Sequence, residues 1–150
     1  MAKKDENDPI SEDEYLLRRI YKDKFRTAKV PLISPRAFEP RVGGRDPDTN
    51  GISLYREDCQ DAVTDILESM AESKRPLTGI ARIPVRSLIE LNLSFIADKD
   101  ATFGIAGHVV IPELNSTDYQ AKKADFAATL LALAEEASKD ENVLVEPSQE

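Results

Sequence analysis

The chain has 150 residues and a formal net charge of −8, with 41% hydrophobic and 32% charged residues, which is typical of one soluble globular domain. Cys59 is the only cysteine and His108 the only histidine, so an internal disulfide and any zinc or iron–sulfur site built from Cys and His alone are excluded. No apolar run approaches the roughly 18 residues that a membrane span needs, and no apolar leader follows the first residue. We therefore expect a cytoplasmic protein without membrane contact.

In chain order, the polar residues 1–10 predict a disordered N-terminal tail. Ser11 and Glu14 have capping-box spacing, and the apolar residues of 16–21 fit a helix face or the start of a strand equally well. Residues 31–51 contain four prolines and three glycines, which indicates a long loop. The alternation over residues 52–56 then predicts a short strand.

The second half alternates between predicted helices and strands. We expect an amphipathic helix over 58–73, a strand over 78–83, a short helix over 84–91, strands over 93–97 and 107–111, and a long helix over 117–138. An acidic C-terminal tail over 139–150 is expected to fray. The prediction is a single α+β domain over 11–138, with a small mixed sheet of about four strands packed by two main amphipathic helices.

Charge is unevenly distributed along the chain. Residues 18–45 contain nine Lys or Arg residues against two acidic ones, whereas both ends of the chain are acidic. Arginine suits the recognition of phosphate and carboxylate groups, and the glycines of the loop allow a ligand to approach the backbone closely. The main functional prediction is therefore a non-enzymatic interaction module, which binds a protein partner or a phosphate-bearing ligand through this region. The residues assigned to binding are Arg36, Phe38, Arg41, Arg45 and Arg56.

Two further binding properties follow from the same features. Nearby aromatic residues leave nucleic-acid binding open, although the net negative charge does not favour it, and most of the basic residues are expected to form a solvated face. The Ala- and Leu-rich helix at 117–138 has a broad apolar surface, which is expected to pack in the core or to form a homo-oligomer contact.

A second functional hypothesis is a small enzyme that acts on a phosphorylated or nucleotide substrate. His108 would be its acid or base, Arg18 or Arg19 its anion clamp, and Tyr55 a polar partner. The alternative is a structural histidine at the start of a buried strand, and on balance the chain is expected not to be an enzyme. The hypothesis requires that His108 opens into a pocket that also contains an arginine.

A third hypothesis concerns residues 46–57, which match the D-x-[DN]-x-[DN]-G-x₅-E pattern of a calcium-binding loop. Asp46, Asp48, Asn50 and Glu57 would supply the oxygen ligands for Ca²⁺. The prolines and glycines before the loop forbid an incoming helix, and no second loop is available to pair with this one. A polar turn that leads into a strand is the alternative, and no other cofactor is expected.

The order of four short blocks resembles that of a group of small uncharacterised bacterial proteins, and the resemblance spans roughly residues 16–112. It implies no catalytic role, because no activity is assigned to the group. The blocks are residues 17–20, 34–38, 48–56 and 107–109.

Overall fold

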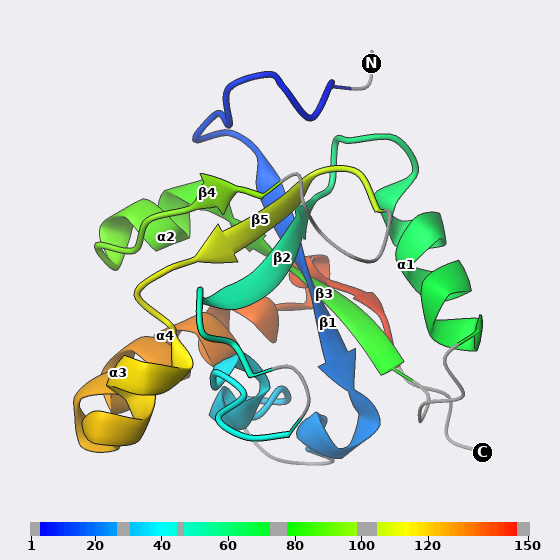
Figure 1. Cartoon of the computed structure of the whole chain (residues 1–150). Coiled ribbons are helices and arrows are strands. Elements are labelled where there is room, and N and C mark those ends of the chain that lie inside the picture. The colour runs from blue at the N-terminus through cyan, green and yellow to red at the C-terminus, as the bar shows by residue number, and fades with distance from the viewer. Residues whose placement is uncertain (1–3, 27–30, 45–46, 73–77, 99–104, 147–150) are drawn as a thin grey trace.

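One antiparallel sheet organises the computed structural model, which describes residues 4–26, 31–44, 47–72, 78–98 and 105–146 (Figure 1). The six strands of this sheet have the spatial order β4-β5-β2-β1-β3-β6. Their bounds are β1 Tyr15–Tyr21, β2 Ile52–Arg56, β3 Thr78–Pro84, β4 Ile96–Ala97, β5 His108–Ile111 and β6 Val143–Val145.

The α+β class is confirmed, but the prediction of a mixed sheet with about four strands was wrong. The four strands that the alternation predicted are all present, and the ambiguous segment around residues 16–21 forms a fifth, β1. The sixth strand, β6, lies in the segment that was predicted to be a tail. Its residues pair with β3 at Ile80↔Val145 and Ala81↔Val143, a partner that lies more than 60 positions away in the sequence.

The described residues contain four α-helices, whereas two main helices and a short one over 84–91 were predicted. Their bounds are α1 Ala62–Glu72, α2 Val85–Glu90, α3 Ser116–Ala121 and α4 Ala127–Ala137. The predicted helix over 117–138 is interrupted because Lys122 leaves the helical conformation (φ −141°, ψ 51°), and a 3₁₀ turn follows at Lys123–Phe126. Asn115 caps α3, since its side chain accepts the Asp118 N–H at 2.8 Å. No helix within the described residues is both long and apolar enough to cross a membrane.

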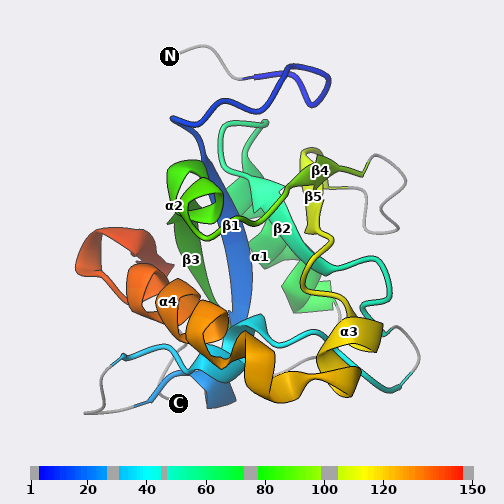
Figure 2. The same ribbon diagram turned by 90° about the vertical axis from the view of Figure 1, so that its left-hand side faces the viewer.

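The sheet has a separate hydrophobic core on each face. Helices α2 and α4 cover one face, as Figure 2 shows, and the apolar residues of α4 pack there with Leu16, Ile20 and Leu54 of the strands. Leu130, Leu133, Ala134 and Ala137 are the buried residues of α4, whereas Leu131 is exposed. Helix α1 covers part of the other face, where Ala62 and Ile66 contact a smaller cluster that includes Leu17 and Tyr55.

The N-terminal segment lies against the buried side chain of Arg56. The Arg56 guanidinium donates to the main-chain oxygens of Asp8 at 2.7 Å and Pro9 at 3.3 Å, and Lys4 forms a parallel bridge with Cys59. The Glu14 carboxylate accepts the Ser11 N–H at 2.7 Å, as in a capping box, but this turn leads into strand β1 and not into a helix.

Candidate functional site

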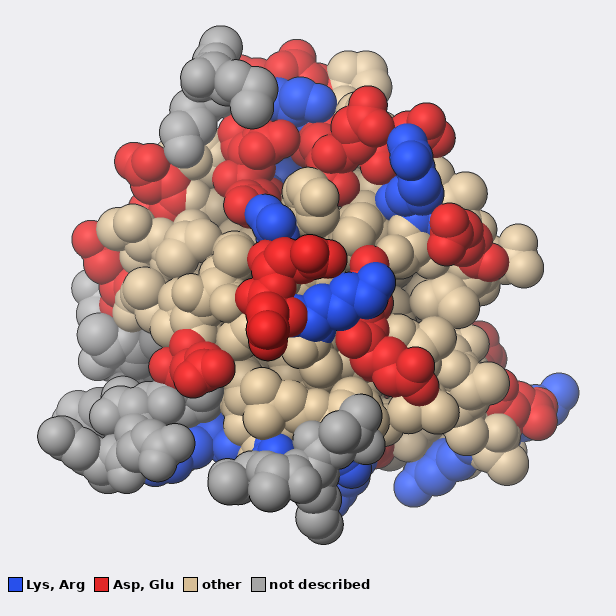
Figure 3. All heavy atoms as spheres, turned by 180° about the vertical axis from the view of Figure 1, so that it is seen from behind, with Lys and Arg blue, Asp and Glu red and all other residues tan. Residues whose placement is uncertain are grey.

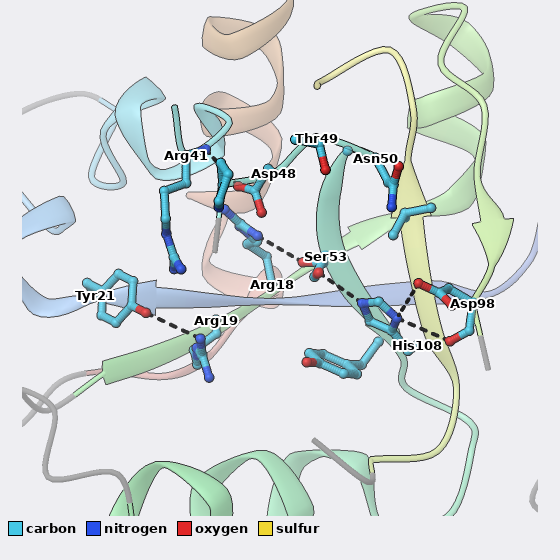
Figure 4. A pocket seen from close by; sticks show the side chains of 14 residues that line it. Arg18, Arg19, Tyr21, Arg41, Asp48, Thr49, Asn50, Ser53, Asp98 and His108 are labelled. Atoms are coloured by element: carbon cyan, nitrogen blue, oxygen red, sulfur yellow. Dashed lines mark hydrogen bonds and ion pairs between the residues drawn. The ribbon is translucent and has the colours of Figure 1, made fainter. Parts of the chain in front are cut away.

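A cleft opens on the face of the sheet that α1 covers only in part (Figure 4). Helix α1 packs over Leu17 and Tyr55. The cleft lies beside the helix and is lined by Arg19 and Tyr21 of β1, Ser53 of β2 and Val110 of β5. Its volume is about 240 Å³. The lining side chains come from three strands, from the loop before β2 and from the segment after β4, and they are Arg18, Arg19, Tyr21, Arg41, Pro47, Asp48, Thr49, Asn50, Gly51, Ser53, Tyr55, Asp98, His108 and Val110.

The cleft forms where strands β1 and β2 separate. The two strands pair at Leu16↔Arg56 and Leu17↔Tyr55, whereas β1 pairs with β3 along its whole length. The side chain of Arg18 occupies the gap that follows. Its Nη1 donates to the main-chain oxygen of Ser53 at 2.9 Å, and its Nε and Nη2 both donate to the main-chain oxygen of Ala37 at 3.1 Å. Arg18 therefore joins the diverging strands to the 3₁₀ turn at Pro35–Phe38.

The positive charge of Arg18 is held by neutral acceptors. All three of its hydrogen bonds end on carbonyl oxygens, which carry only partial charge. Burial lowers the pKa of Arg18, and the charge of Asp48 opposes that shift. Because arginine stays protonated in proteins, the consequence is a cation beside the cleft that a bound anion would stabilise.

Arg19 adds a second cation to the cleft. Its Nη2 donates to the Tyr21 hydroxyl at 3.2 Å, and its guanidinium carbon lies 5.6 Å from the centroid of the Tyr21 ring. Among the described residues, no carboxylate lies within ion-pair distance of Arg19. Its aromatic neighbour orients the guanidinium without neutralising it.

The loop before β2 is fixed around Asp48. The Asp48 carboxylate accepts the Arg41 N–H at 2.7 Å, and the Asp48 N–H donates to the Arg41 main-chain oxygen at 2.8 Å. The main-chain oxygen of Asp48 also accepts the Ser116 N–H at 2.9 Å, which ties the loop to the start of α3. Gly51 has a φ of +121°, and a Cβ at this position would lie 2.2 Å from the Ile111 oxygen, so only glycine fits this approach to β5. These contacts hold one wall of the cleft in place.

His108 lies at the opposite wall and is bonded through both ring nitrogens. Nε2 lies 2.9 Å from the Ser53 hydroxyl, and Nδ1 lies 3.2 Å from the main-chain oxygen and 3.5 Å from the carboxylate of Asp98. The rings of Tyr55 and His108 are 5.4 Å apart at an angle of 45°, and burial raises the pKa of Tyr55. The imidazole is thus held in one orientation by groups on β2 and on the segment after β4.

The structure brings together the residues of the enzyme hypothesis. His108, Arg18, Arg19 and Tyr55 all line the one cleft, so the required pocket with a histidine and an arginine is present. Arg41, which was assigned to partner binding, lines it as well.

The other residues assigned to binding lie elsewhere. Arg36 is exposed, pairs with Glu39 at 3.1 Å, and borders an adjoining hollow of about 110 Å³ that shares Arg18, Arg19 and Arg41 with the cleft. Phe38 and Arg56, expected at a binding surface, are instead fully buried. Arg45 lies outside the described residues.

The proposed calcium ligands do not gather at one point. Asp48 lies in the loop before the extended strand β2 and Glu57 follows that strand, which spans about 17 Å at 3.3 Å per residue. Glu57 pairs with Arg82 at 3.5 Å, whereas Asp48 bonds to Arg41. No group of three or more His, Cys, Asp or Glu side chains in the described part of the chain could hold a metal ion. Asp46 lies outside that part, and calcium binding stays a prediction.

The residues of the cleft that were not assigned from the sequence include Ser53, Asp98 and Tyr21. Period-two alternation carries a signal for Ser53, because it places Ser53 and Tyr55 on the same face of β2. The pairing Tyr55↔His108 then makes His108 a diagonal neighbour of Ser53, but this register is not readable from a single sequence. Asp98 had no such signal, since it comes from the segment after β4.

The comparisons with known proteins give no relative from which a function could be transferred. No protein-family model matches the chain, and no match was found among curated proteins or among solved structures.

Proposed function

We propose that the cleft binds a small molecule that carries a phosphate group. The observation that supports this most is the placement of Arg18, Arg19 and Arg41 around one cavity, with the half-buried Arg18 bonded only to carbonyl oxygens. A phosphate dianion offers several strong acceptors to guanidinium donors and compensates more than one positive charge.

The distribution of charge over the rest of the molecule favours a local anion site over a general polyanion surface. The net charge is −8, and acidic side chains are spread widely over the side of the molecule seen in Figure 3. Such a surface repels the extended phosphate backbone of a nucleic acid. A short ligand avoids most of this repulsion, because it contacts only the lining of the cleft, where Arg18, Arg19 and Arg41 outnumber Asp48 and Asp98.

The size and chemistry of the cavity indicate the class of ligand. A volume of about 240 Å³ is below the usual range for drug-sized ligands, but it has room for a phosphate group and a small organic part. The Tyr21 and Tyr55 side chains offer aromatic surface on the same lining, and the Thr49 and Asn50 side chains offer hydrogen-bonding groups. Together these groups suit a small phosphate ester.

Binding can be tested by thermal unfolding of the intact chain with inorganic phosphate and with phenyl phosphate, each against chloride at matched ionic strength. At a ligand concentration ten times Kd, binding stabilises the fold by about 1.4 kcal/mol, which raises Tm by roughly 3–6 °C for a domain of this size. Arg19→Gln should remove this rise, because it deletes one cation of the cleft and breaks no main-chain hydrogen bond among the described residues.

Arg86→Gln is the matched control. Arg86 is an arginine on the surface of α2 that lies outside the cleft. It pairs with Glu12 and Asp13 of the N-terminal segment. The proposal would be contradicted if phosphate did not raise the Tm of the unmodified chain. It would also be contradicted if phosphate raised the Tm of Arg19→Gln and of Arg86→Gln equally. Capture of a protein partner that depends on the exposed Arg36, without any phosphate effect, would instead favour the interaction module.

A further inference from the structure

Ser53 and His108 form a hydrogen-bonded pair at the wall of the cleft (Figure 4). The Ser53 Oγ lies 2.9 Å from His108 Nε2, and both residues border the cavity. His108 is mostly buried, with 9% of its side chain exposed, and Ser53 is half-buried. The pair is therefore sheltered from bulk water but accessible from the cleft.

The surroundings of the imidazole determine which of its nitrogens carries the proton. Nδ1 faces two oxygens of Asp98, the main-chain carbonyl at 3.2 Å and the carboxylate at 3.5 Å. A carbonyl and an ionised carboxylate are acceptors only, so Nδ1 must be the donor to either of them. Nε2 of the neutral ring is then an acceptor, and the Ser53 hydroxyl must donate to it. His108 is thus positioned as a base toward the Ser53 hydroxyl, with Asp98 fixing the tautomer.

We propose that Ser53 is a nucleophile that takes a phosphoryl group from a phosphate monoester bound in this cleft. The inference rests on the proposed binding function and adds a reaction to it. The Ser53 Oγ attacks phosphorus and forms an O–P bond, its proton passes to His108 Nε2, and the P–O bond to the leaving group breaks. His108 then gives that proton to the leaving-group oxygen, which departs as an alcohol or a phenol.

Water completes the cycle. A water molecule attacks the phosphorus of phosphoserine and transfers a proton to His108, the bond between Ser53 Oγ and phosphorus breaks, and Ser53 recovers its proton from the imidazole. The products are inorganic phosphate and the free alcohol, and no oxidant, reductant or further reactant is consumed.

The arginines occupy the positions that this reaction requires. Arg18 Nη1 donates to the main-chain oxygen of Ser53 itself, which places its guanidinium next to the nucleophile. Arg19 lies on the neighbouring strand and borders the same cavity. Positive charge held in a sheltered site stabilises the transferring phosphoryl oxygens, and because Arg18 is fixed by three hydrogen bonds, little reorganisation is needed during the reaction.

A serine nucleophile is distinguished from a structural serine by its reaction with a neutral organophosphorus probe. Diisopropyl phosphorofluoridate transfers its phosphoryl group to an activated serine with loss of fluoride, and it does not need an anion site. We expect labelling of the intact chain at Ser53, located by mass spectrometry of peptides. Labelling should disappear in Ser53→Ala and slow by roughly 100-fold or more in His108→Gln.

Ser94→Ala is the matched control, because Ser94 is also hydrogen-bonded, to the Glu113 carboxylate at 2.7 Å, but lies outside the cleft. It should label as the unmodified chain does. Unfolding curves of all variants establish that loss of labelling is not loss of fold. An unlabelled Ser53 in a folded chain would overturn the proposal, even where phosphate still raises Tm, so the two proposals fail separately.

Release of inorganic phosphate from phenyl phosphate tests the second half of the inference. Release is expected from the unmodified chain and from Ser94→Ala, and it should be lost in Ser53→Ala. If Ser53 were labelled but no phosphate were released, the conclusion that Ser53 is an activated serine would stand, and the proposed transfer of a phosphoryl group from a phosphate monoester would be overturned. Release that persists in Ser53→Ala would assign the chemistry to another group and overturn the role of Ser53.

Discussion

Two arginines on neighbouring strands, the fully buried Arg56 and the half-buried Arg18, show how differently this fold treats a positive charge. Arg56 at the end of β2 forms a two-pronged pair with Glu14, with both N–O distances at 2.9 Å and both side chains 1% exposed. Arg18 in the middle of β1 forms three hydrogen bonds, and every one ends on a carbonyl oxygen. One charge is neutralised within the protein and the other is not.

This difference separates a structural site from a candidate binding site. The Glu14–Arg56 pair joins the N-terminal segment to the sheet, and its charges leave nothing for a ligand to compensate. Arg18 has no carboxylate within ion-pair distance among the described residues, and it borders a cavity that two further arginines also line. Burial alone therefore does not mark an arginine as functional, and what matters is whether its charge is compensated.

The largest expected effect comes from removing the charge of Glu14. Glu14→Gln leaves the buried Arg56 cation without its counter-charge, and the loss of one partner of a buried ion pair typically costs about 3–5 kcal/mol of unfolding free energy. Urea unfolding measures this loss. Glu12→Gln is the control, because the exposed pair of Glu12 with Arg86 contributes at most about 1 kcal/mol. Equal stability of the two variants would contradict the structural role assigned to the pair.

The sequence predicted the secondary structure around these two arginines better than it predicted the roles of the arginines themselves. Alternation identified β2 with its observed bounds, and helical spacing identified the segments of α1 and α4 as helical, because both signals are local. The charge of Arg56 suggested a surface residue, since a single sequence does not show that Glu14, 42 positions earlier, lies opposite it in the fold. Strand β6 was missed for the same reason, because its pairing with β3 is long-range.

The candidate site was predicted in part. The enzyme hypothesis named four residues that line one cleft, because His108 is the only histidine and the arginines are concentrated in one segment. It did not name Ser53 or Asp98, which become neighbours of His108 only through the register of β2 with β5 and the return of the chain after β4. Composition therefore indicated the chemistry, and strand pairing determined the geometry.

A smaller effect is expected at the uncompensated arginine. Arg18→Met removes three donors and leaves the main-chain oxygens of Ala37 and Ser53 to find new partners, which costs about 1–3 kcal/mol. Relief of the half-buried charge, which no carboxylate pairs with among the described residues, offsets part of this cost, so the loss should be smaller than that of Glu14→Gln. The stabilisation by phosphate should disappear altogether. Urea unfolding with and without phosphate, at matched ionic strength, measures both quantities.

Arg18→Lys sharpens that test. Lysine keeps the charge but lacks the planar fork that reaches both carbonyl oxygens, so stability should fall while part of the phosphate effect remains. If Arg18→Met lost more stability than Glu14→Gln and still responded to phosphate, the assignment of structural and binding roles to the two arginines would have to be reversed.

The pH dependence of stability gives the smallest expected effect and concerns Glu14 alone. Burial would raise the pKa of Glu14, but the hydrogen bonds from Arg56 and Ser11 outweigh it and hold the pKa below its ordinary value of 4.5. A carboxyl group whose pKa is lowered by folding stabilises the folded state above its unfolded pKa, and this contribution is lost as the pH falls through the folded value. Each unit of lowering corresponds to about 1.4 kcal/mol.

The contribution of Glu14 to stability should therefore be constant above pH 4.5 and should decline below it. The decline in stability should be shallower in Glu14→Gln, which has no carboxyl group to protonate at this position. Urea unfolding from neutral pH downward, on the unmodified chain and on Glu14→Gln and Glu12→Gln, measures the slopes. The slope for Glu12→Gln should match that of the unmodified chain. Identical slopes for all three would show that other carboxyl groups dominate acid unfolding, and the pair with Arg56 would then not be what lowers the pKa of Glu14.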